Sequence, residues 1–224
     1  MSRSYKFDIY TYGVPVLLVL SMWISFWLNT HTRLNLNEYG IMPRAFSGLI
    51  GIVCSPFLHA DLNHLWSNTP PILLLGIALF YFFRYEAGRI FMLAVLLSGF
   101  MTWLIGRESY HIGASGLIYF LASFLISKGV IKKSKELVAL SFAVVFFYGS
   151  LVWYVFPIDN AISWEGHLAG AIAGIILAMV INTTDLEVKA KIPKTIRGTE
   201  QEDWFLQQFD ENGDFAPFLI DEEE

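Results

Sequence analysis

The residue types that could carry chemistry stand at the start of apolar segments. Ser115 lies in the run Gly113-Ala114-Ser115-Gly116, which follows a short polar loop and opens an apolar stretch from Leu117 to Ile131. A serine at a helix start has unpaired backbone N–H groups and the positive end of the helix dipole beside it. This environment suits a nucleophile whose attack produces an oxyanion. The alternative is a chance Gly-x-Ser-Gly whose small residues serve only helix packing.

A candidate proton acceptor, His167, stands at the start of another apolar stretch, which continues with Gly170 and Gly174. Small residues four apart allow two membrane helices to approach closely. If this segment packs against the one that begins at Ser115, the hydroxyl and the imidazole come within hydrogen-bond reach. The pair could then act as nucleophile and general base. The alternative is that the two glycines form a packing motif and nothing more.

Further polar residues precede these two segments. His64 and Asn68 are four apart at the start of an apolar stretch and therefore share one helix face, and His59 comes shortly before them. Ionisable residues within membrane spans are costly and are functional candidates by default, although a lone histidine at a helix end is usually an interfacial residue. Polar groups from four separate segments at one membrane level favour a site over packing.

The composition requires that most of these segments lie in a membrane. The 224 residues are 55% hydrophobic and 16% charged, with a mean hydropathy of +0.51, whereas a soluble domain would carry more charge. Apolar runs of membrane-spanning length recur along the chain. We therefore expect an all-α membrane protein, a bundle of six transmembrane helices at Ile9–Leu28, His64–Phe83, Ile90–Ile105, Ser115–Ile131, Leu137–Phe156 and His167–Asn182.

The third, fourth and sixth of these spans are short, at about 16–17 residues, where roughly 20 are needed to cross the hydrocarbon core. One explanation is local thinning of the bilayer. The other is that Ser115 and His167 begin their helices below the outer surface, at the floor of a water-filled cavity. Irregular backbone is allowed at that depth only if it lines such a cavity or is buried in protein.

The loops and the C-terminal region complete the expected organisation. Six spans place most Lys and Arg residues on one side, which predicts that both termini are cytoplasmic. The first outer loop contains an apolar segment, Phe46–Val53, that is too short to span and is expected to associate with the membrane. We expect a core over residues 1–182 and a flexible cytoplasmic tail over 183–224, which is first basic and then carries ten acidic residues from 198 onward.

The sequence also narrows the possible partners. The single cysteine, Cys54, excludes an internal disulfide. The chain has no Cys/His cluster of the kind that binds zinc and no phosphate-binding glycine loop before a lysine. We therefore expect no metal and no cofactor, and no nucleic-acid partner.

Taken in order, these motifs resemble those of the rhomboid family of intramembrane serine proteases. Gly113 to Gly116 matches the nucleophile motif of the family, with Ser115 as nucleophile. His167, with Gly170 and Gly174, matches its general-base helix. The resemblance covers about residues 9–182, and the tail has no counterpart. The Trp-Arg pair common in the first outer loop of the family is not present as a pair.

The resemblance also assigns roles to the upstream residues. His64 and Asn68 match a His-x-x-x-Asn motif whose side chains line the oxyanion hole together with the backbone N–H of the nucleophile Ser115. Tyr119 matches an aromatic residue that packs against the base, and His59 resembles a further family histidine. With no Asp or Glu well placed in the spans, we expect Tyr119 and the tight helix contact to orient the imidazole, and Glu165 to point elsewhere.

The resemblance implies a multi-pass serine endopeptidase of the prokaryotic inner membrane. Its substrates would be transmembrane proteins in the lipid bilayer, cleaved near the outer face by a Ser115–His167 dyad. One rival is a catalytically inactive rhomboid-like protein that binds transmembrane clients. A second is a small transporter, which the absence of acidic residues within the spans and of an inverted repeat argues against.

Overall fold

The computed structural model describes residues 9–32, 34–147, 154–158 and 162–183. These residues belong to one compact unit, Met1–Leu186, and over the ranges just given they form helices and loops without a β-strand. Of the tail that we predict over residues 183–224, only Thr183 lies within the described residues. Predictions for that tail therefore stay predictions.

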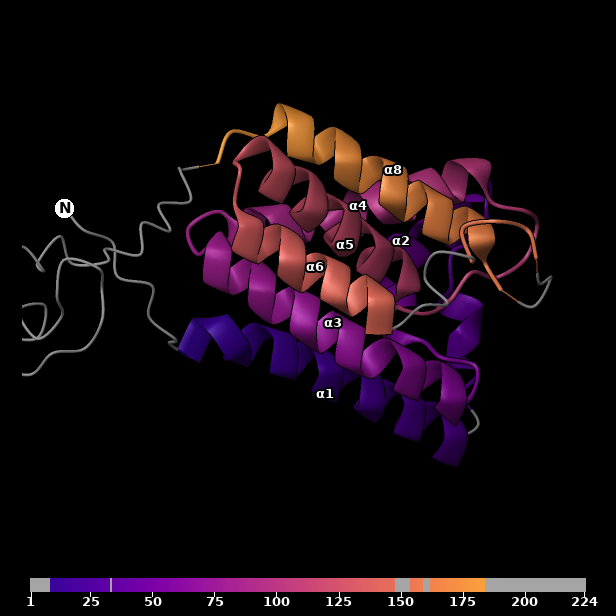
Figure 1. The fold of residues 1–224 in the computed structure, drawn as a ribbon. Helices are drawn as coiled ribbons and strands as arrows, with labels where there is room; N and C mark the ends of the chain where they lie inside the picture. Colours follow the sequence, from indigo (N-terminus) through magenta and orange to yellow (C-terminus); the bar gives the residue numbers. More distant parts are fainter. Residues whose placement is uncertain (1–8, 33, 148–153, 159–161, 184–224) are drawn as a thin grey trace, which may run out of the picture. The chain divides into compact units, whose positions relative to one another are not determined.

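The described residues contain seven α-helices and three short 3-10 helices (Figure 1). The α-helices are α1 (Ile9–His31), α2 (Gly51–Cys54), α3 (Leu62–Phe82), α4 (Ala87–Ile105), α5 (Ser115–Ile131), α6 (Lys135–Phe147) and α8 (Trp164–Val180). The loop between α1 and α3, which we predict to be the first outer loop, holds α2 and the 3-10 helices η1 (Leu36–Tyr39), η2 (Phe46–Leu49) and η3 (Ser55–Phe57). This loop is thus built from short helical turns.

Three of the helices, α1, α3 and α4, are long and apolar enough to cross a membrane, and α5 and α8 are apolar but have 17 residues each. The protein is therefore an integral membrane protein with an all-helical core. The predicted fifth span, Leu137–Phe156, is described as helix only to Phe147, and residues 148–153 lie outside the described part of the chain.

Several predicted helix ends were wrong for identifiable reasons. α4 begins at Ala87, so the third span has 19 residues and is not short. It includes Arg89, which is exposed, because a long cationic side chain can extend to the interface while its backbone stays helical. α8 begins at Trp164 because Ser163 caps it, accepting a hydrogen bond from the Gly166 N–H. α5 begins and ends as predicted.

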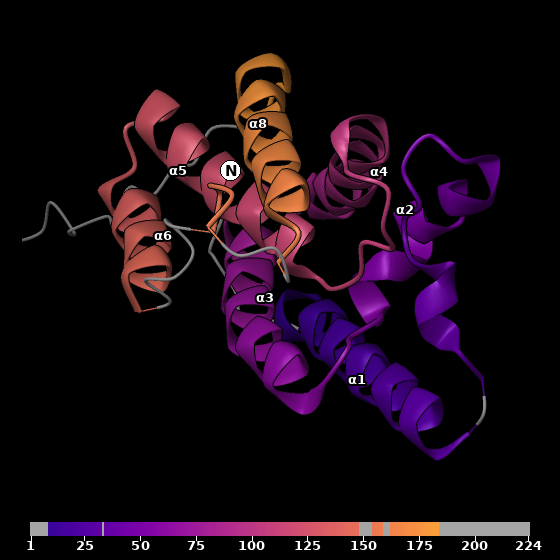
Figure 2. The ribbon, with the colours of Figure 1, turned by 90° about the vertical axis from the view of Figure 1, so that its right-hand side faces the viewer.

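Helix α5 is the buried centre of the unit. Ten of its 17 residues are buried, and it contacts α3, α4, α6 and α8. A helix that is apolar all round is expected in such a position. Figure 2 shows α8 running between α5 and α4, and α1 packed beside α3. α5 therefore carries Ser115 on an element whose position is fixed from several sides.

Residues with little or no side chain make the contact between α5 and α8. A Cβ atom on Gly170 would overlap the carbonyl oxygen of Gly116, and one on Gly174 would overlap the Phe120 carbonyl and the Ser123 hydroxyl. This is the close approach that the four-residue spacing predicts. The Ser123 hydroxyl also donates a hydrogen bond to α8.

Two lysines hold the other end of α8. The buried Lys128 ammonium donates to the carbonyl of Ile181 at 2.6 Å, and Lys132 donates to the carbonyl of Thr183 at 3.1 Å. Cations at a helix C-terminus satisfy carbonyls that have no partner within the helix and interact favourably with its dipole. α8 is therefore fixed to α5 at its C-terminal end by hydrogen bonds as well as by packing.

Gly170→Ala should destabilise the protein, because its methyl group would meet the Gly116 backbone rather than a side chain that can move. Overpacking of this kind costs about 1–3 kcal/mol, which thermal unfolding in detergent would measure as a lower Tm. The matched control is Gly88→Ala in α4, where a Cβ meets nothing within 4 Å. A Gly170→Ala protein as stable as the control would show that the helices do not approach this closely.

Candidate active site

The structure brings Ser115 and His167 together. Ser115 is the first residue of α5, and His167 lies in the first turn of α8. The His167 Nε2 atom is 2.8 Å from the Ser115 hydroxyl oxygen, which is hydrogen-bond distance. The imidazole is 5% exposed. The pair is therefore shielded by protein, and its contact follows directly from the packing of α8 on α5.

A backbone carbonyl fixes the tautomer of the His167 ring. The Nδ1 atom lies 2.8 Å from the carbonyl oxygen of Tyr154. A carbonyl can only accept a hydrogen bond, so Nδ1 carries the proton and donates it to this bond. Nε2 of the neutral ring then presents a lone pair to the Ser115 hydroxyl. This is the tautomer that a general base needs.

The carbonyl of Tyr154 is the functional group that sequence reasoning missed. We expected the Tyr119 ring and the tight helix contact to orient the imidazole. A backbone carbonyl has no signature in residue type, so only the fold could reveal it. Glu165 does point elsewhere, since its carboxylate lies 3.8 Å from the Nε atom of Arg107.

Tyr119 packs face to face on the imidazole. The Tyr119 and His167 ring centroids are 4.3 Å apart and the ring planes differ by 14°. Tyr119 follows Ser115 by one helical turn, so Ser115 and the stacked ring share a face of α5. The Tyr119 hydroxyl is buried and has no hydrogen-bond partner among the described residues. What Tyr119 gives to His167 is therefore the flat face of its ring.

Gly113 lets a second histidine approach the Ser115 loop. Its φ angle is +106°, a conformation that glycine adopts at no steric cost. A Cβ atom there would lie 2.5 Å from the Nε2 atom of His64. The Gly113 N–H is held by the carbonyl of Ser55 at 2.9 Å. A hydrogen bond thus fixes the backbone of this turn, and the edge of the His64 ring lies where a side chain at position 113 would be.

His64 and Asn68 lie on one face of α3, whose N-terminus is capped by Asp61 through the His64 N–H at 2.9 Å. Asn68 is buried, and its amide nitrogen donates to the carbonyl of His64 at 2.7 Å. A primary amide has a second N–H, which this bond leaves available. Neither side chain hydrogen-bonds to Ser115 in the described part of the chain. The structure places His64 beside the Ser115 loop and Asn68 one turn further along.

His59 supports His64 by contact. The two ring centroids are 4.9 Å apart with an interplanar angle of 67°. Burial, with a smaller contribution from His64, lowers the pKa of His59 to about 3, so the ring is neutral. Its ring nitrogens have no hydrogen-bond partner among the described residues. His59 therefore meets His64 as an uncharged aromatic ring.

A small polar cavity adjoins Ser115. Its volume is about 30 Å³, which is enough for a water molecule. Its polar lining includes Ser55, Ser98, Thr102, His111 and Ser163. Among the described residues no group of three or more His, Cys, Asp or Glu side chains could hold a metal ion.

Comparison with known proteins places this geometry in a family context. The pattern of the family described as Rhomboid domain matches residues 47–183, which include Ser115 and His167. An uncharacterized protein of Mycobacterium tuberculosis is 34% identical over 173 residues, 71% of this chain and 69% of the relative. One of Mycobacterium leprae is 32% identical over 193 residues, 80% and 74% of the two chains. Rhomboid-related protein 1 of Caenorhabditis elegans is 29% identical over 150 residues, 63% and 42%.

Two replacements of Tyr119 should distinguish the contribution of its ring from that of its hydroxyl. Tyr119→Phe keeps the stacked ring and removes a hydroxyl without a partner, so Ser115 should react with a fluorophosphonate at the wild-type rate. Tyr119→Leu loses the stack and should react more slowly, by about 10-fold or more if the imidazole shifts. Labelling rates of the two purified variants measure the difference. Equal loss in both would show that the hydroxyl, not the ring, serves His167.

Proposed function

Since this chain belongs to the rhomboid family, we propose that it is an intramembrane serine endopeptidase with Ser115 as nucleophile and His167 as general base. The observation that carries the proposal is the 2.8 Å contact between His167 Nε2 and the Ser115 hydroxyl, with Nδ1 bound to a carbonyl. A serine–histidine contact in this tautomer is the arrangement that activates a hydroxyl for attack. No cofactor is needed for that step.

In acylation the Ser115 oxygen attacks the carbonyl carbon of a peptide bond while Nε2 of His167 takes the hydroxyl proton. The imidazolium formed keeps its Nδ1–H bond to the Tyr154 carbonyl, which strengthens as the ring becomes charged. The Tyr119 face lies against the same ring and attracts its positive charge. His167 then gives its Nε2 proton to the leaving amine, which breaks the C–N bond and leaves an acyl-serine.

The oxyanion would be held by the backbone N–H of Ser115 and by the side chains of His64 and Asn68. Ser115 opens α5, so its N–H lies among the helix-terminal donors that have no acceptor within the helix. The His64 ring edge faces the Gly113 turn next to it. Donors arranged in advance stabilise the developing charge without reorganising, and removal of one typically costs about 10²–10³ in rate.

Hydrolysis of the acyl-serine needs water at Ser115. The polar cavity beside Ser115 has room for one molecule and offers hydroxyl groups to bind it. With the acyl group in place, Nε2 of His167 is again a base and would remove a proton from this water as its oxygen attacks the ester carbon. Ser115 then leaves with that proton and the starting state is restored.

For topology we propose six spans with both termini in the cytoplasm. His64, Ser115 and His167 all stand near the N-terminal ends of their helices, which are α3, α5 and α8. With six spans the chain would cross the membrane twice between the start of α3 and the start of α5, and twice again before the start of α8. The three helix starts would then lie on the same side of the membrane, the outer one. The 17-residue lengths of α5 and α8 fit a site below that surface. The substrates would be transmembrane segments of proteins that unwind near their outer ends, in the inner membrane of a prokaryote.

Removal of the dyad tests the activity. The wild-type protein in detergent should react with a fluorophosphonate and cleave a model transmembrane substrate, whereas Ser115→Ala and His167→Ala should do neither at a measurable rate. Asn68→Ala should cleave about 10²–10³-fold more slowly. The matched controls are Ser21→Ala, at a partly buried position of α1, and His31→Ala, at an exposed one. Both should behave as wild type.

Two outcomes would contradict the proposal in different ways. A folded wild-type protein that neither labels nor cleaves would favour the catalytically inactive binder of transmembrane clients. A Ser115→Ala protein that cleaves as well as wild type would show that another residue is the nucleophile. Cleavage by the Ser21→Ala control but not by Ser115→Ala excludes a general effect of losing a serine.

The acidic part of the tail should be dispensable for chemistry. Residues 198–224 carry ten acidic side chains and no Lys or Arg, and every residue assigned a role above precedes them. Deletion of this segment should leave the rate of substrate cleavage in detergent unchanged. Loss of cleavage in a deletion variant with an unchanged Tm would mean that the tail contributes to the site.

A further inference from the structure

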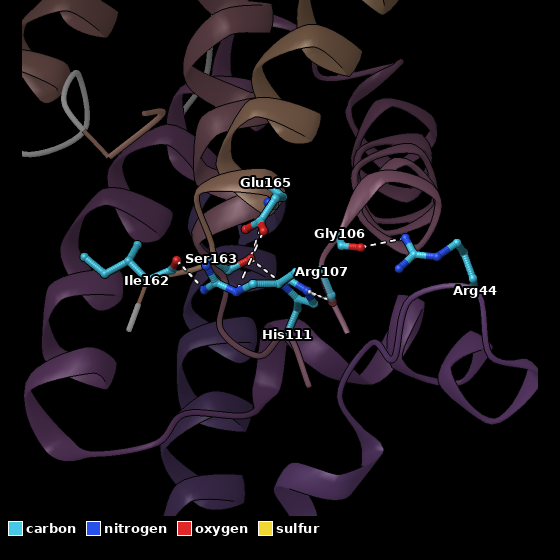
Figure 3. Close-up of polar contacts among 8 residues, drawn as sticks. Arg44, Gly106, Arg107, His111, Ile162, Ser163 and Glu165 are labelled. Carbon is cyan, nitrogen blue, oxygen red and sulfur yellow. Dashed lines mark hydrogen bonds and ion pairs between the residues drawn. The ribbon is translucent and has the colours of Figure 1, made fainter. Parts of the chain in front are cut away.

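A polar cluster outside the dyad joins the loop before Ser115 to the start of α8. The loop between α4 and α5 carries Arg107 and His111, and both side chains reach the residues that begin α8 (Figure 3). The proposed reaction gives Arg107 no direct part, and His111 enters it only as part of the lining of the cavity beside Ser115. The cluster nevertheless adjoins both members of the dyad. Its loop end precedes Ser115, and its other end lies at the start of α8, whose first turn holds His167.

Arg107 contacts this helix start through its guanidinium group. Its Nη2 atom donates to the carbonyl of Ile162 at 2.8 Å, and its Nε atom is 3.8 Å from the carboxylate of Glu165. The Glu165 side chain is 5% exposed and the Arg107 side chain 35%. The carboxylate is therefore buried beside its partner. It also occupies the first turn of α8, where the helix dipole favours a negative charge.

His111 holds the residue that caps the same helix. Its Nε2 atom is 3.0 Å from the carbonyl of Arg107 and its Nδ1 atom is hydrogen-bonded to the Ser163 hydroxyl. Burial lowers the pKa of His111, so the ring is neutral, with its proton on Nε2 because the carbonyl can only accept. Ser163 then donates to Nδ1 and accepts from the Gly166 N–H. The cap of α8 is thereby tied to the loop.

The loop is in turn anchored on its other side. His111 and Ile41 exchange two backbone hydrogen bonds of 2.9 Å each, and the Arg44 guanidinium donates to the Gly106 carbonyl at 2.7 Å. The loop between α1 and α3 thus anchors the loop between α4 and α5, which in turn contacts the start of α8. A displacement of the start of α8 would need several of these bonds to break together.

The contact between α5 and α8 explains why such an anchor is needed. The glycine face sets how closely the two helices approach. Hydrogen bonds from Ser123, Lys128 and Lys132 hold the middle and the C-terminal end of α8, but none of them holds its start. A buried ion pair is weak evidence for stability, because the cost of desolvation offsets its attraction, and its best-attested use is to select one register. The buried Glu165 carboxylate is therefore better explained by a role in positioning α8 than by a contribution to the stability of the fold.

We propose that Arg107 and Glu165 are positioning residues that fix the axial and rotational register of α8, and with it the approach of His167 to Ser115. His111 and Ser163 hold the same turn through the helix cap. This inference rests on the proposed function in one respect, since its kinetic consequence requires that the dyad be catalytic. Its geometric consequence, the state of the His167 ring, does not.

Uncharged replacements of Arg107 and Glu165 distinguish a role in positioning α8 from a role in stabilising the fold. Arg107→Met leaves the buried Glu165 carboxylate without this cation and should lower Tm, whereas the double variant with Glu165→Gln leaves no buried carboxylate and should recover most of the loss. The double variant should still cleave more slowly in kcat, by about 10-fold to 10²-fold, with KM little changed, because a small misplacement of a reacting group has that effect. Glu108→Gln on the same loop is the matched control, since the Glu108 side chain is 87% exposed and pairs with Arg44 rather than with α8.

A second readout does not depend on activity. Heteronuclear NMR of the His167 ring nitrogens should show a single tautomer protonated at Nδ1 in the wild type and in Glu108→Gln. In the double variant the ring should populate both tautomers, because its bonds to the Tyr154 carbonyl and the Ser115 hydroxyl are no longer held at full occupancy.

The outcomes decide the two proposals separately. A double variant with wild-type Tm, wild-type ring signals and, where the wild type is active, wild-type kcat would overturn the positioning role and leave a dispensable pair. A wild-type protein without activity would overturn the proposed function, and the ring signals would still decide the positioning role. Recovered Tm with altered ring signals supports positioning whether or not the protein cleaves.

Discussion

The approach of α8 to α5 is the constraint on which the rest of the structure depends. Gly170 lies so close to the Gly116 carbonyl that no side chain fits between them. Ser115 and His167 stand on these two helices, one residue before Gly116 and three before Gly170, so the helix separation sets the distance between hydroxyl and imidazole. A larger residue at Gly170 would therefore move His167 away from Ser115.

A close contact of glycines has little apolar surface to hold it together. Within a bilayer the hydrophobic effect does not drive helix association, so packing and interhelical hydrogen bonds must do so. The described structure supplies such bonds along the whole of α8. Lys128 and Lys132 bind carbonyls at its C-terminal end, Ser123 binds one near its middle, and Arg107 and the His111 ring hold its start. The polar groups therefore lie where they restrain one helix, and the small residues decide how close it comes.

The sequence predicted those parts of the site that depend on spacing within one segment. Ser115 at a helix start and the glycines of α8 could be recognised this way, and α5 has the predicted ends. Tyr119 was singled out only by the family resemblance. The sequence could not predict contacts between distant segments whose residue types have many other uses. Arg107 and Glu165 are 58 positions apart, and each alone looks like an interfacial charge. The start of α4 was missed because Arg89 interrupts the apolar pattern without interrupting the helix.

The group that orients His167 illustrates a physical limit on what a membrane site can use. In a soluble serine hydrolase a buried carboxylate commonly holds the Nδ1–H, but an unpaired carboxylate in hydrocarbon surroundings is costly. The carbonyl of Tyr154 gives the same tautomer with a dipole in place of a charge. In the proposed reaction it would stabilise the imidazolium less than a carboxylate would, so more of that task would fall to the Tyr119 ring stacked on the imidazole. The buried acid nearest in sequence, Glu165, is neutralised by Arg107. In the positioning role proposed above, its charge would hold the helix that carries His167 and would not bind His167 itself.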